Sequence, residues 1–162
     1  MKSIANDGPN APRRRQLNRA VKESLRDLSN QLSVLNHYVG ARLELRDVDL
    51  DCLDLITRHG PLSPSALAQR AGLHPATVTG ILDRLQRGGW VTRERHPTDR
   101  RVIAVRALRA RNRELFELYS AMNSSMDQIC GDYSQPELEL LAEFLRRTTD
   151  AGRAAAEGLT GT

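Results

Sequence analysis

The chain has 162 residues, of which 40% are hydrophobic and 27% are charged, so it can bury the core of one compact domain. Aromatic residues make up only 4%, which predicts a core of Leu, Val, Ile and Ala in packed helices and argues against an aromatic-rich sandwich. The formal net charge is +4, and nearly all of the basic residues are arginines, whose planar guanidinium suits phosphate and guanine.

No stretch of the sequence approaches the roughly 20 apolar residues that a membrane span requires, and residues 1–15 lack the apolar segment of a signal peptide. We therefore expect a cytoplasmic protein with no membrane partner. Cys52 and Cys130 lie far apart and form no CxxC pattern, which predicts neither a disulfide framework nor a zinc module. The histidines show no metal-ligand spacing, so we expect no metal and no cofactor.

Residues 1–14 combine Asn, Asp, Gly and Pro with a basic run and show no apolar periodicity, which predicts a flexible basic arm. Over residues 15–46, apolar residues recur at alternating spacings of three and four, which predicts one long helix. Its seam consists of Leu25, Leu28, Leu32, Leu35 and Val39. A short helix is expected over residues 48–58, and Gly60 and Pro61 end it.

Two further helices begin with clear capping signals. Ser63 can accept a hydrogen bond from the free amides of the next turn, and Pro64 fits the first helical position, where no N–H is needed. His74 and Pro75 repeat this arrangement. The first of these helices is expected to end at Gly72 and the second to run to residue 87, before a pair of glycines.

Residues 90–94 and 102–106 are β-prone and are joined by a polar turn, which predicts a hairpin. Residues 108–158 then hold two helical stripes that require a partner helix. The first consists of Leu115, Tyr119, Met122, Met126 and Ile129, and the second of Leu138, Leu141 and Leu145. Gly131 separates the two helices, and Ser134 with Glu137 makes a capping box for the second. Residues 159–162 are expected to fray.

The two helices between residues 64 and 87 have the pattern of a helix-turn-helix. Their tight turn forces a steep crossing, which requires a small residue where they touch and apolar residues beneath. Ala68 stands at the crossing point, Gly72 in the turn and Val78 beneath. Neighbouring buried positions are expected at Leu67, Ala71, Leu73, Ile81 and Leu82. This pattern predicts that the second helix enters the major groove of double-stranded DNA.

The N-terminal residues of such a second helix lie at the base edges. Here they are Pro75, Ala76, Thr77, Thr79 and Gly80. These small residues allow contacts with thymine methyl groups and hydroxyl hydrogen bonds, but they place no arginine at guanine. The alternative interpretation of Thr77 and Thr79 is a solvated helix face.

Between residues 84 and 113 the chain has ten arginines and two acidic residues. A surface that meets phosphates concentrates positive charge in this way, although a charge run is more often a solvated face. Because this run coincides with a hairpin directly after a helix-turn-helix, we interpret it as part of a nucleic-acid interface. Candidate contacts are Arg84, Arg93, Arg100 and Arg101, of which the last two could enter a narrow minor groove.

The sequence from residue 47 to residue 108 resembles the MarR family of bacterial winged-helix regulators. The resemblance rests on the small-residue helix after Ser63, the Thr-Val-Thr segment at 77–79, the Asp-Arg-Leu run that leads to Gly-Gly-Trp-Val, and Asp99-Arg100-Arg101 in the hairpin. It implies a mainly α fold with a small β-hairpin wing. In that fold a winged helix-turn-helix over residues 47–107 is carried by a helical dimerisation platform at 15–46 and 108–158.

The resemblance also implies a homodimeric transcriptional regulator, in the usual case a repressor, bound to a near-palindromic promoter site. Arg101 would probe the minor groove, and Asp99 would brace it or pair with Arg84. Ser63 and Ser65, at the head of their helix, would meet phosphate.

Two positions depart from the family's pattern: the family often has a serine where His74 stands and a basic residue where Gly80 stands.

Regulators of this kind often release DNA when a small anionic or phenolic effector enters a crevice beside the helix-turn-helix. Candidate pocket residues are His37, Tyr38, Arg42, Ile56 and Tyr119. A tyrosine at helical spacing is more often part of the core, which is the alternative interpretation.

Other functions fit the residues less well. Redox sensing needs a reactive thiol, but Cys52 lies among Asp49, Asp51 and Asp54, whose charges raise a thiol pKa. An enzyme needs a nucleophile beside a base, but Cys52 and His59 are two helical turns apart, so we expect no catalytic residues. The alternative function is an architectural DNA-binding protein without an effector, which would show little sequence preference at raised salt.

Overall fold

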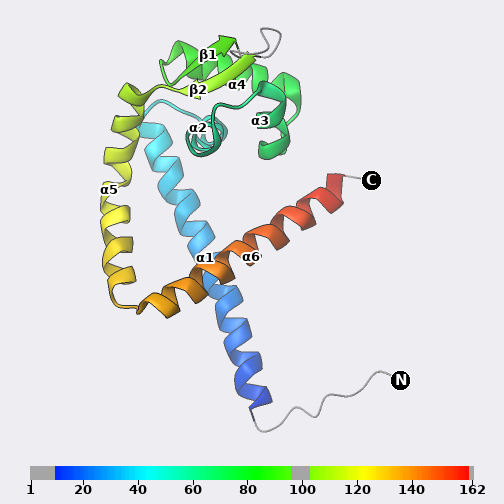
Figure 1. Ribbon diagram of the computed structural model, residues 1–162, viewed down its shortest axis with the longest axis vertical. Helices are drawn as coiled ribbons and strands as arrows, with labels where there is room; N and C mark the ends of the chain where they lie inside the picture. The colour runs from blue at the N-terminus through cyan, green and yellow to red at the C-terminus, as the bar shows by residue number, and fades with distance from the viewer. Residues whose placement is uncertain (1–9, 96–102, 161–162) are drawn as a thin grey trace. The chain divides into compact units, whose positions relative to one another are not determined.

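The computed structural model describes residues 10–95 and 103–160. Its elements are α1 (Ala11–Arg42), α2 (Asp47–His59), α3 (Pro64–Ala71), α4 (Pro75–Arg87), β1 (Val91–Arg95), β2 (Ile103–Ala107), α5 (Arg109–Gly131) and α6 (Gln135–Thr160) (Figure 1). The predicted fold class, mainly α with a small β-hairpin, is confirmed. The chain forms two compact units, Met1–Phe116 and Glu117–Thr162, and each is described by itself.

Helix α1 begins at Ala11, so the predicted basic arm over residues 1–14 is wrong for its last four residues. Pro12 lies in the first turn, where its fixed φ suits a helix and its missing N–H costs no hydrogen bond. The arginines that follow are good helix formers, so the helix starts earlier than the apolar seam. It ends at Arg42, and the flanking residues Val39 and Leu43 are buried where α1 meets α2.

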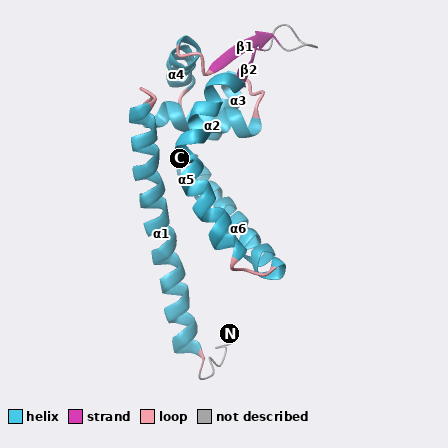
Figure 2. Ribbon diagram, turned by 90° about the vertical axis from the view of Figure 1, so that its left-hand side faces the viewer, coloured by secondary structure: helices cyan, strands magenta, loops and turns pink. Residues whose placement is uncertain are grey.

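Helices α2, α3 and α4 pack against one another around an apolar core, with the two strands beside them (Figure 2). The core side chains that are at most 2% exposed are Leu50, Cys52, Leu53, Ile56, Leu67, Val78, Ile81, Leu82, Leu85, Trp90, Val91 and Val105. Ala68, at the predicted crossing point, is buried as well. Ala71 and Leu73 are only half-buried, because they flank the turn at the surface of the unit.

The turn between α3 and α4 has the expected geometry. Gly72 has φ 65° and ends α3 in the left-handed region, which favours glycine. The N–H of Leu73 donates to the carbonyl oxygen of Ala68 at 3.0 Å, and this bond closes the end of the helix. The predicted helix-turn-helix is therefore present, with both of its helices at the predicted positions.

The wing is a two-stranded antiparallel sheet in which Val91 pairs with Ala107 and Arg95 pairs with Ile103. Both strands end one residue later than predicted. Leu62, just before α3, adds an isolated bridge: its N–H donates to the Val105 carbonyl at 3.0 Å and its carbonyl accepts from the Val105 N–H at 2.7 Å. This bridge, which the sequence did not predict, ties the hairpin to the helix-turn-helix.

Two glycines turn the chain from α4 into β1. Gly89 has φ 72°, and a Cβ at Gly88 would lie only 2.7 Å from Cδ1 of Trp90. Trp90 is buried, and the guanidinium of Arg111 lies 4.5 Å from its ring centroid while donating to the Gly88 carbonyl at 3.0 Å. The base of the wing is therefore fixed to both α4 and the start of α5.

The second unit consists of α5 from Glu117 onward and the whole of α6. At the start of α6, the N–H and the hydroxyl of Ser134 both donate to Oε2 of Glu137, at 2.8 and 2.6 Å, which is the Glu half of the predicted capping box. Helix α6 continues to Thr160, so the predicted fraying from residue 159 is wrong for two residues. Three alanines at 154–156 favour this extension.

Within the described ranges, no helix has the length and apolar character needed to cross a membrane.

Candidate nucleic-acid interface

Helix α4 has one buried face and one open face. Val78, Ile81, Leu82 and Leu85 are buried against the core. The residues predicted to lie at the base edges are on the open side: Pro75, Ala76, Thr77 and Thr79 are exposed, and Gly80 is half-buried. The geometry therefore leaves the N-terminal half of α4 available to a groove of DNA, as a second helix of this motif requires.

The open face of α4 is poor in side-chain donors. The hydroxyl of Thr79 donates to the Pro75 carbonyl at 3.2 Å, which leaves its oxygen lone pairs and its methyl group for an outside partner. Ala76 and Gly80 add no polar group. Contacts from this face are therefore confined to close van der Waals approach, thymine methyl groups and the hydroxyl groups of Thr77 and Thr79.

The N-termini of both helices are capped by side chains. Ser63 Oγ accepts from the Ala66 N–H at 3.2 Å and lies 3.1 Å from Ser65 Oγ, so the two predicted phosphate contacts stand together at the head of α3. At the head of α4, Nδ1 of His74 accepts from the Ala76 N–H at 3.2 Å. The sequence predicted His74 as a cap and as a departure from the family's pattern, but not as a DNA contact.

Arg84 is held by Asp49 of α2, and its predicted contact with DNA stays a prediction. Its Nε and Nη2 atoms donate to the two carboxylate oxygens of Asp49 at 3.0 and 2.6 Å. The Asp49 side chain is only 3% exposed, so this bidentate pair links α2 to α4 inside the winged unit. Asp99, the partner that the resemblance implied, lies outside the described residues.

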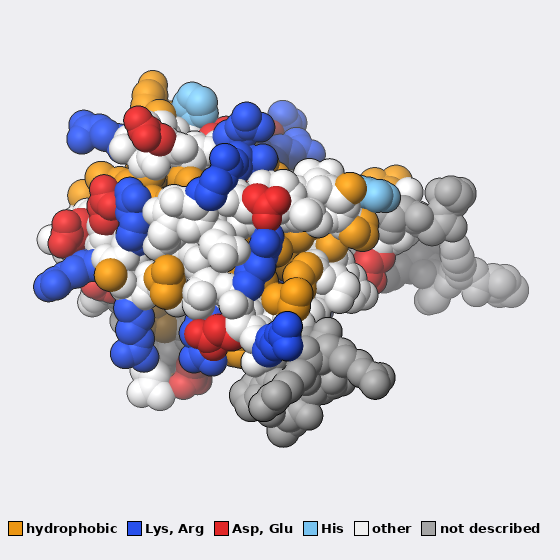
Figure 3. Space-filling view, turned by 90° about the horizontal axis from the view of Figure 1, so that it is seen from above, with side chains coloured by type: hydrophobic (Ala, Val, Ile, Leu, Met, Phe, Trp, Pro, Cys, Tyr) orange, Lys and Arg blue, Asp and Glu red, His pale blue; other side chains and the backbone are white. Residues whose placement is uncertain are grey.

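Several other arginines of the basic run also have acidic partners that the run itself does not contain. Arg93 Nη2 donates to Asp83 Oδ1 at 2.6 Å, and Arg111 lies 3.5 Å from Glu114. The wing side of the molecule accordingly shows basic side chains interspersed with acidic ones (Figure 3). The local excess of positive charge that the sequence predicts is therefore partly neutralised by Asp49, Asp83 and Glu114.

The predicted tip of the wing, Asp99-Arg100-Arg101, falls outside the described residues, as does the polar turn around it. Arg95, the last described residue of β1, is exposed. The roles of the tip arginines therefore stay predictions.

The predicted effector residues do not form a common cavity within the winged unit. Ile56 is 1% exposed and belongs to the core, which corrects its assignment to an open pocket. His37 and Tyr38 are exposed and stack edge to face with ring centroids 6.1 Å apart, and His37 Nδ1 lies 3.2 Å from the Asp47 carboxylate. Arg42 is exposed, and Tyr119 belongs to the second unit.

The Cys52 thiol is placed for packing and not for chemistry. It is completely buried, and burial, followed by the charges of Asp51 and Asp49, raises the pKa of the thiol to about 11. Asp49 and Asp51 act on the thiol pKa in the predicted direction, whereas burial, which the sequence did not predict, has the larger effect. Among the described residues, no three His, Cys, Asp or Glu side chains gather in a way that could hold a metal ion.

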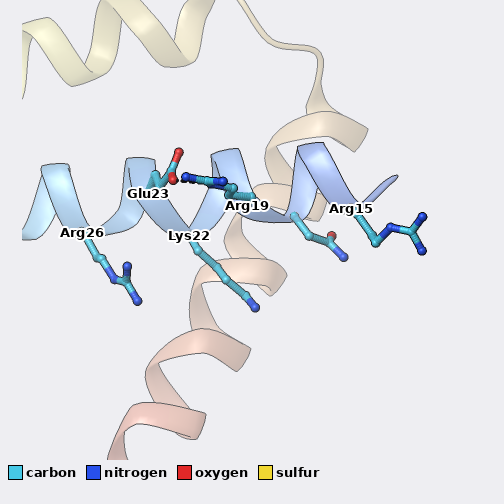
Figure 4. Close-up of a pocket in the computed structure, with 6 residues that line it drawn as sticks. Arg15, Arg19, Lys22, Glu23 and Arg26 are labelled. Carbon is cyan, nitrogen blue, oxygen red and sulfur yellow. Dashed lines mark hydrogen bonds and ion pairs between the residues drawn. The ribbon is translucent and has the colours of Figure 1, made fainter. Parts of the chain in front are cut away.

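Apart from the winged part of the chain, a row of polar side chains lines a shallow hollow along the first half of α1 (Figure 4). It consists of Arg15, Asn18, Arg19, Lys22, Glu23 and Arg26. Arg19 Nε donates to Glu23 Oε1 at 2.7 Å, and this ion pair neutralises part of the positive charge of the row. Of these residues, Arg26 lies nearest to the end of α1 that contacts α2, and about 20 Å of helix still separates it from that end. We therefore interpret this row as a solvated face outside the DNA interface.

Comparison with known proteins places the chain in a family. Residues 45–103 match the MarR family. The helix-turn-helix transcriptional repressor YetL of Bacillus subtilis (strain 168) is 30% identical over 125 residues, which cover 75% of this chain and 74% of YetL. YcgE of the same organism, an uncharacterized helix-turn-helix transcriptional regulator, is 28% identical over 137 residues, which cover 85% of this chain and 89% of YcgE.

Solved structures share the fold. A MarR family protein from Bacillus stearothermophilus has a TM-score of 0.64 at 19% identity and covers 85% of this chain and 96% of its own. The transcriptional regulator Tm0710 from Thermotoga maritima has a TM-score of 0.60 at 22% identity, with coverages of 82% and 94%. The relatives in sequence are regulators and not enzymes. With its helix-turn-helix, its wing and these relatives, the chain belongs to the MarR family of helix-turn-helix transcriptional regulators.

Proposed function

We propose that the protein is a sequence-specific DNA-binding repressor that acts as a homodimer on a near-palindromic promoter site. The observation that carries the proposal is the open N-terminal half of α4, whose opposite face is fixed in the core beside a wing tied down by the Leu62 bridge. A rigid helix with small outward residues can lie deep in a major groove.

The homodimer is supported by apolar side chains that the single chain leaves exposed. On α1, α5 and α6 these include Leu17, Val21, Leu28, Leu32, Val34, Phe116, Met126, Ile129, Leu140, Leu141, Phe144, Leu145 and Leu159. Exposed apolar stripes along helices of this kind are ordinarily buried against a second copy. Two-fold symmetry would then place two α4 helices in successive major grooves, about 34 Å apart.

Repression is the direction suggested by YetL, which is named a repressor. Relief of repression by a small anionic or phenolic effector is the accompanying proposal, and its support is the exposed His37, Tyr38 and Arg42 at the end of α1. A panel of phenolic carboxylates and simple phenols should raise the melting temperature and weaken DNA binding. If no compound changes either quantity, the effector-independent alternative replaces this part of the proposal.

The test of DNA binding is a fluorescence-anisotropy titration of promoter duplexes over a range of salt concentrations. We expect affinity to fall steeply with salt, because cations on the protein displace counterions from phosphates. Arg101→Ala should weaken binding several-fold and lower the salt slope by about one, without unfolding the protein. Arg26→Ala removes the same charge from the row on α1 and is the matched control, which should bind as the wild type does. Equal losses for the two variants would contradict the assignment of the wing tip.

A further inference from the structure

The backbone donors at the start of α4 are all used within the protein. Pro75 has no N–H, and the Ala76 N–H donates to Nδ1 of His74. The N–H groups of Thr77 and Val78 donate to the His74 carbonyl oxygen at 3.0 and 3.2 Å. A helix N-terminus ordinarily offers such amides to phosphate, but here His74 accepts from all three of them.

The hydrogen bond from Ala76 fixes the state of the imidazole ring. A nitrogen that accepts a hydrogen bond carries a lone pair and no proton, so Nδ1 of His74 is unprotonated. In the neutral ring the proton then lies on Nε2, which is a hydrogen-bond donor on the far side of the ring from the Ala76 amide. His74 is exposed, and no hydrogen bond to Nε2 is present among the described residues.

The position of His74 brings that donor to the proposed interface. His74 directly precedes Pro75, Ala76 and Thr77, which are exposed and stand where a second helix of this motif meets base edges. Ala76 and Gly80 have no polar side-chain group, and the Thr79 hydroxyl gives its proton to Pro75. The exposed Thr77 hydroxyl is one side-chain donor at this end of α4, and the His74 ring supplies a second one just before the helix.

We propose that His74 contacts DNA directly, because Nδ1 caps α4 while Nε2–H donates a hydrogen bond to an acceptor on the DNA. The acceptor is a purine N7 or guanine O6 at the groove edge or a phosphate oxygen beside it, and all of these accept from a neutral N–H. The inference rests on the proposed DNA-binding function.

The cap and the DNA contact can be separated with three variants. His74→Ser retains a capping oxygen and removes the ring donor, His74→Asn is a second capping variant without the ring, and His74→Ala removes both functions. We expect His74→Ser and His74→Asn to melt with the wild type, whereas His74→Ala should melt about 2–8 °C lower. Binding to duplexes selected by the wild-type protein should weaken about three- to tenfold in all three variants.

Two outcomes would overturn the role of His74. In one, His74→Ser and His74→Asn bind the selected duplexes as tightly as the wild type. In the other, the loss of affinity follows the loss of melting temperature, which would make His74 only a cap. A wild-type protein that binds no duplex would instead contradict the proposed function itself, so the two failures are distinguishable.

Repeating the duplex selection with His74→Ser distinguishes the two sources of the acceptor. Relaxed preference at one base pair in each half-site identifies a base edge, whereas a uniform loss of affinity across sequences identifies a phosphate. A ¹⁵N spectrum of the free wild-type protein supplies an independent readout. It should show His74 with its proton on Nε2, and a spectrum with the proton on Nδ1 would overturn the inference.

Discussion

At the scale of residues, the Asp49–Arg84 ion pair joins two helices across 35 positions of sequence. Removing one partner of such a pair leaves the other poorly solvated and uncompensated. We predict that Arg84→Ala lowers the free energy of unfolding by about 2–3 kcal/mol. This loss is smaller than the one expected on breaking a fully buried ion pair, because the Arg84 side chain is 31% exposed. Urea unfolding followed by circular dichroism measures the change.

The double variant Asp49→Leu/Arg84→Met is the control for this prediction. It replaces both charges with apolar groups of similar size and should recover most of the lost stability. A loss for Arg84→Ala below about 0.5 kcal/mol, in the range of an exposed pair, would contradict a structural role for the ion pair.

The Cys52 thiol gives a prediction about reactivity. With its pKa raised to about 11, the thiol stays protonated and enclosed at neutral pH. In a Cys130→Ser background we predict no reaction with dithionitrobenzoate at about pH 8 until the protein is unfolded. Rapid modification of the folded protein would show that the site opens.

The same pKa shift predicts a loss of stability in alkali. The unfolded thiol loses its proton near its ordinary pKa of about 8.5, whereas the folded thiol keeps it up to about pH 11. The free energy of unfolding should therefore fall as the pH rises through this window. Cys52→Ala should lack this contribution, and a wild-type curve that matches the variant would contradict the shift.

The long-range partners of the arginines could not be predicted from the sequence. Asp49 and Asp83 lie before the basic run, and no local spacing connects them to Arg84 and Arg93. The cap at His74, in contrast, was visible from its place before Pro75. What the sequence could not show was which ring nitrogen accepts the Ala76 amide, because that depends on the side-chain rotamer.

At the scale of elements, Gly80 stands inside α4 without a packing reason. A Cβ at this position would meet only Nη1 of Arg84, at 3.6 Å, which is ordinary van der Waals contact. We predict that Gly80→Ala raises the free energy of unfolding by about 0.5–1 kcal/mol, because alanine is the better helix former. The same substitution should weaken DNA binding at least about threefold, because the added methyl group prevents the closest approach of α4 to the groove. Thermal unfolding and anisotropy measure the two effects.

Gly152→Ala is the matched control, since a Cβ there meets nothing within 4 Å and the residue lies within α6. It should stabilise the protein to a similar degree and leave DNA binding unchanged. If Gly80→Ala binds DNA as tightly as the wild type does, close approach of the α4 backbone is not part of recognition.

Helices with strong terminal signals were predicted closely, and elements without them were not. Ser63-Pro64, Gly72 and His74-Pro75 fixed the bounds of α3 and α4, because capping is local chemistry. The start of α1 was placed too late, because Pro12 and the arginines carry no apolar periodicity. The Leu62–Val105 bridge was missed, because a single paired residue has no pattern of its own.

At the scale of the whole molecule, the apolar seam of α1 is the most direct probe of assembly. Leu28 and Leu32 are 45% and 38% exposed in the single chain. We predict that Leu28→Glu/Leu32→Glu gives a folded monomer or a much weaker dimer by sedimentation equilibrium, because two charges would be buried at the interface. Lys22→Glu, on another face of the same helix, is the control and should remain a dimer. A wild-type monomer would contradict the proposal.

A dimer that reads a specific DNA sequence through α4 and the wing should select one class of site. This can be measured by selecting bound sites from random duplex DNA at moderate salt and determining the stoichiometry of the selected complex. We predict a near-palindromic site with half-sites about one helical turn apart, bound by two chains. Recovery of unrelated sequences with equal affinity, or a complex with one chain, would contradict it.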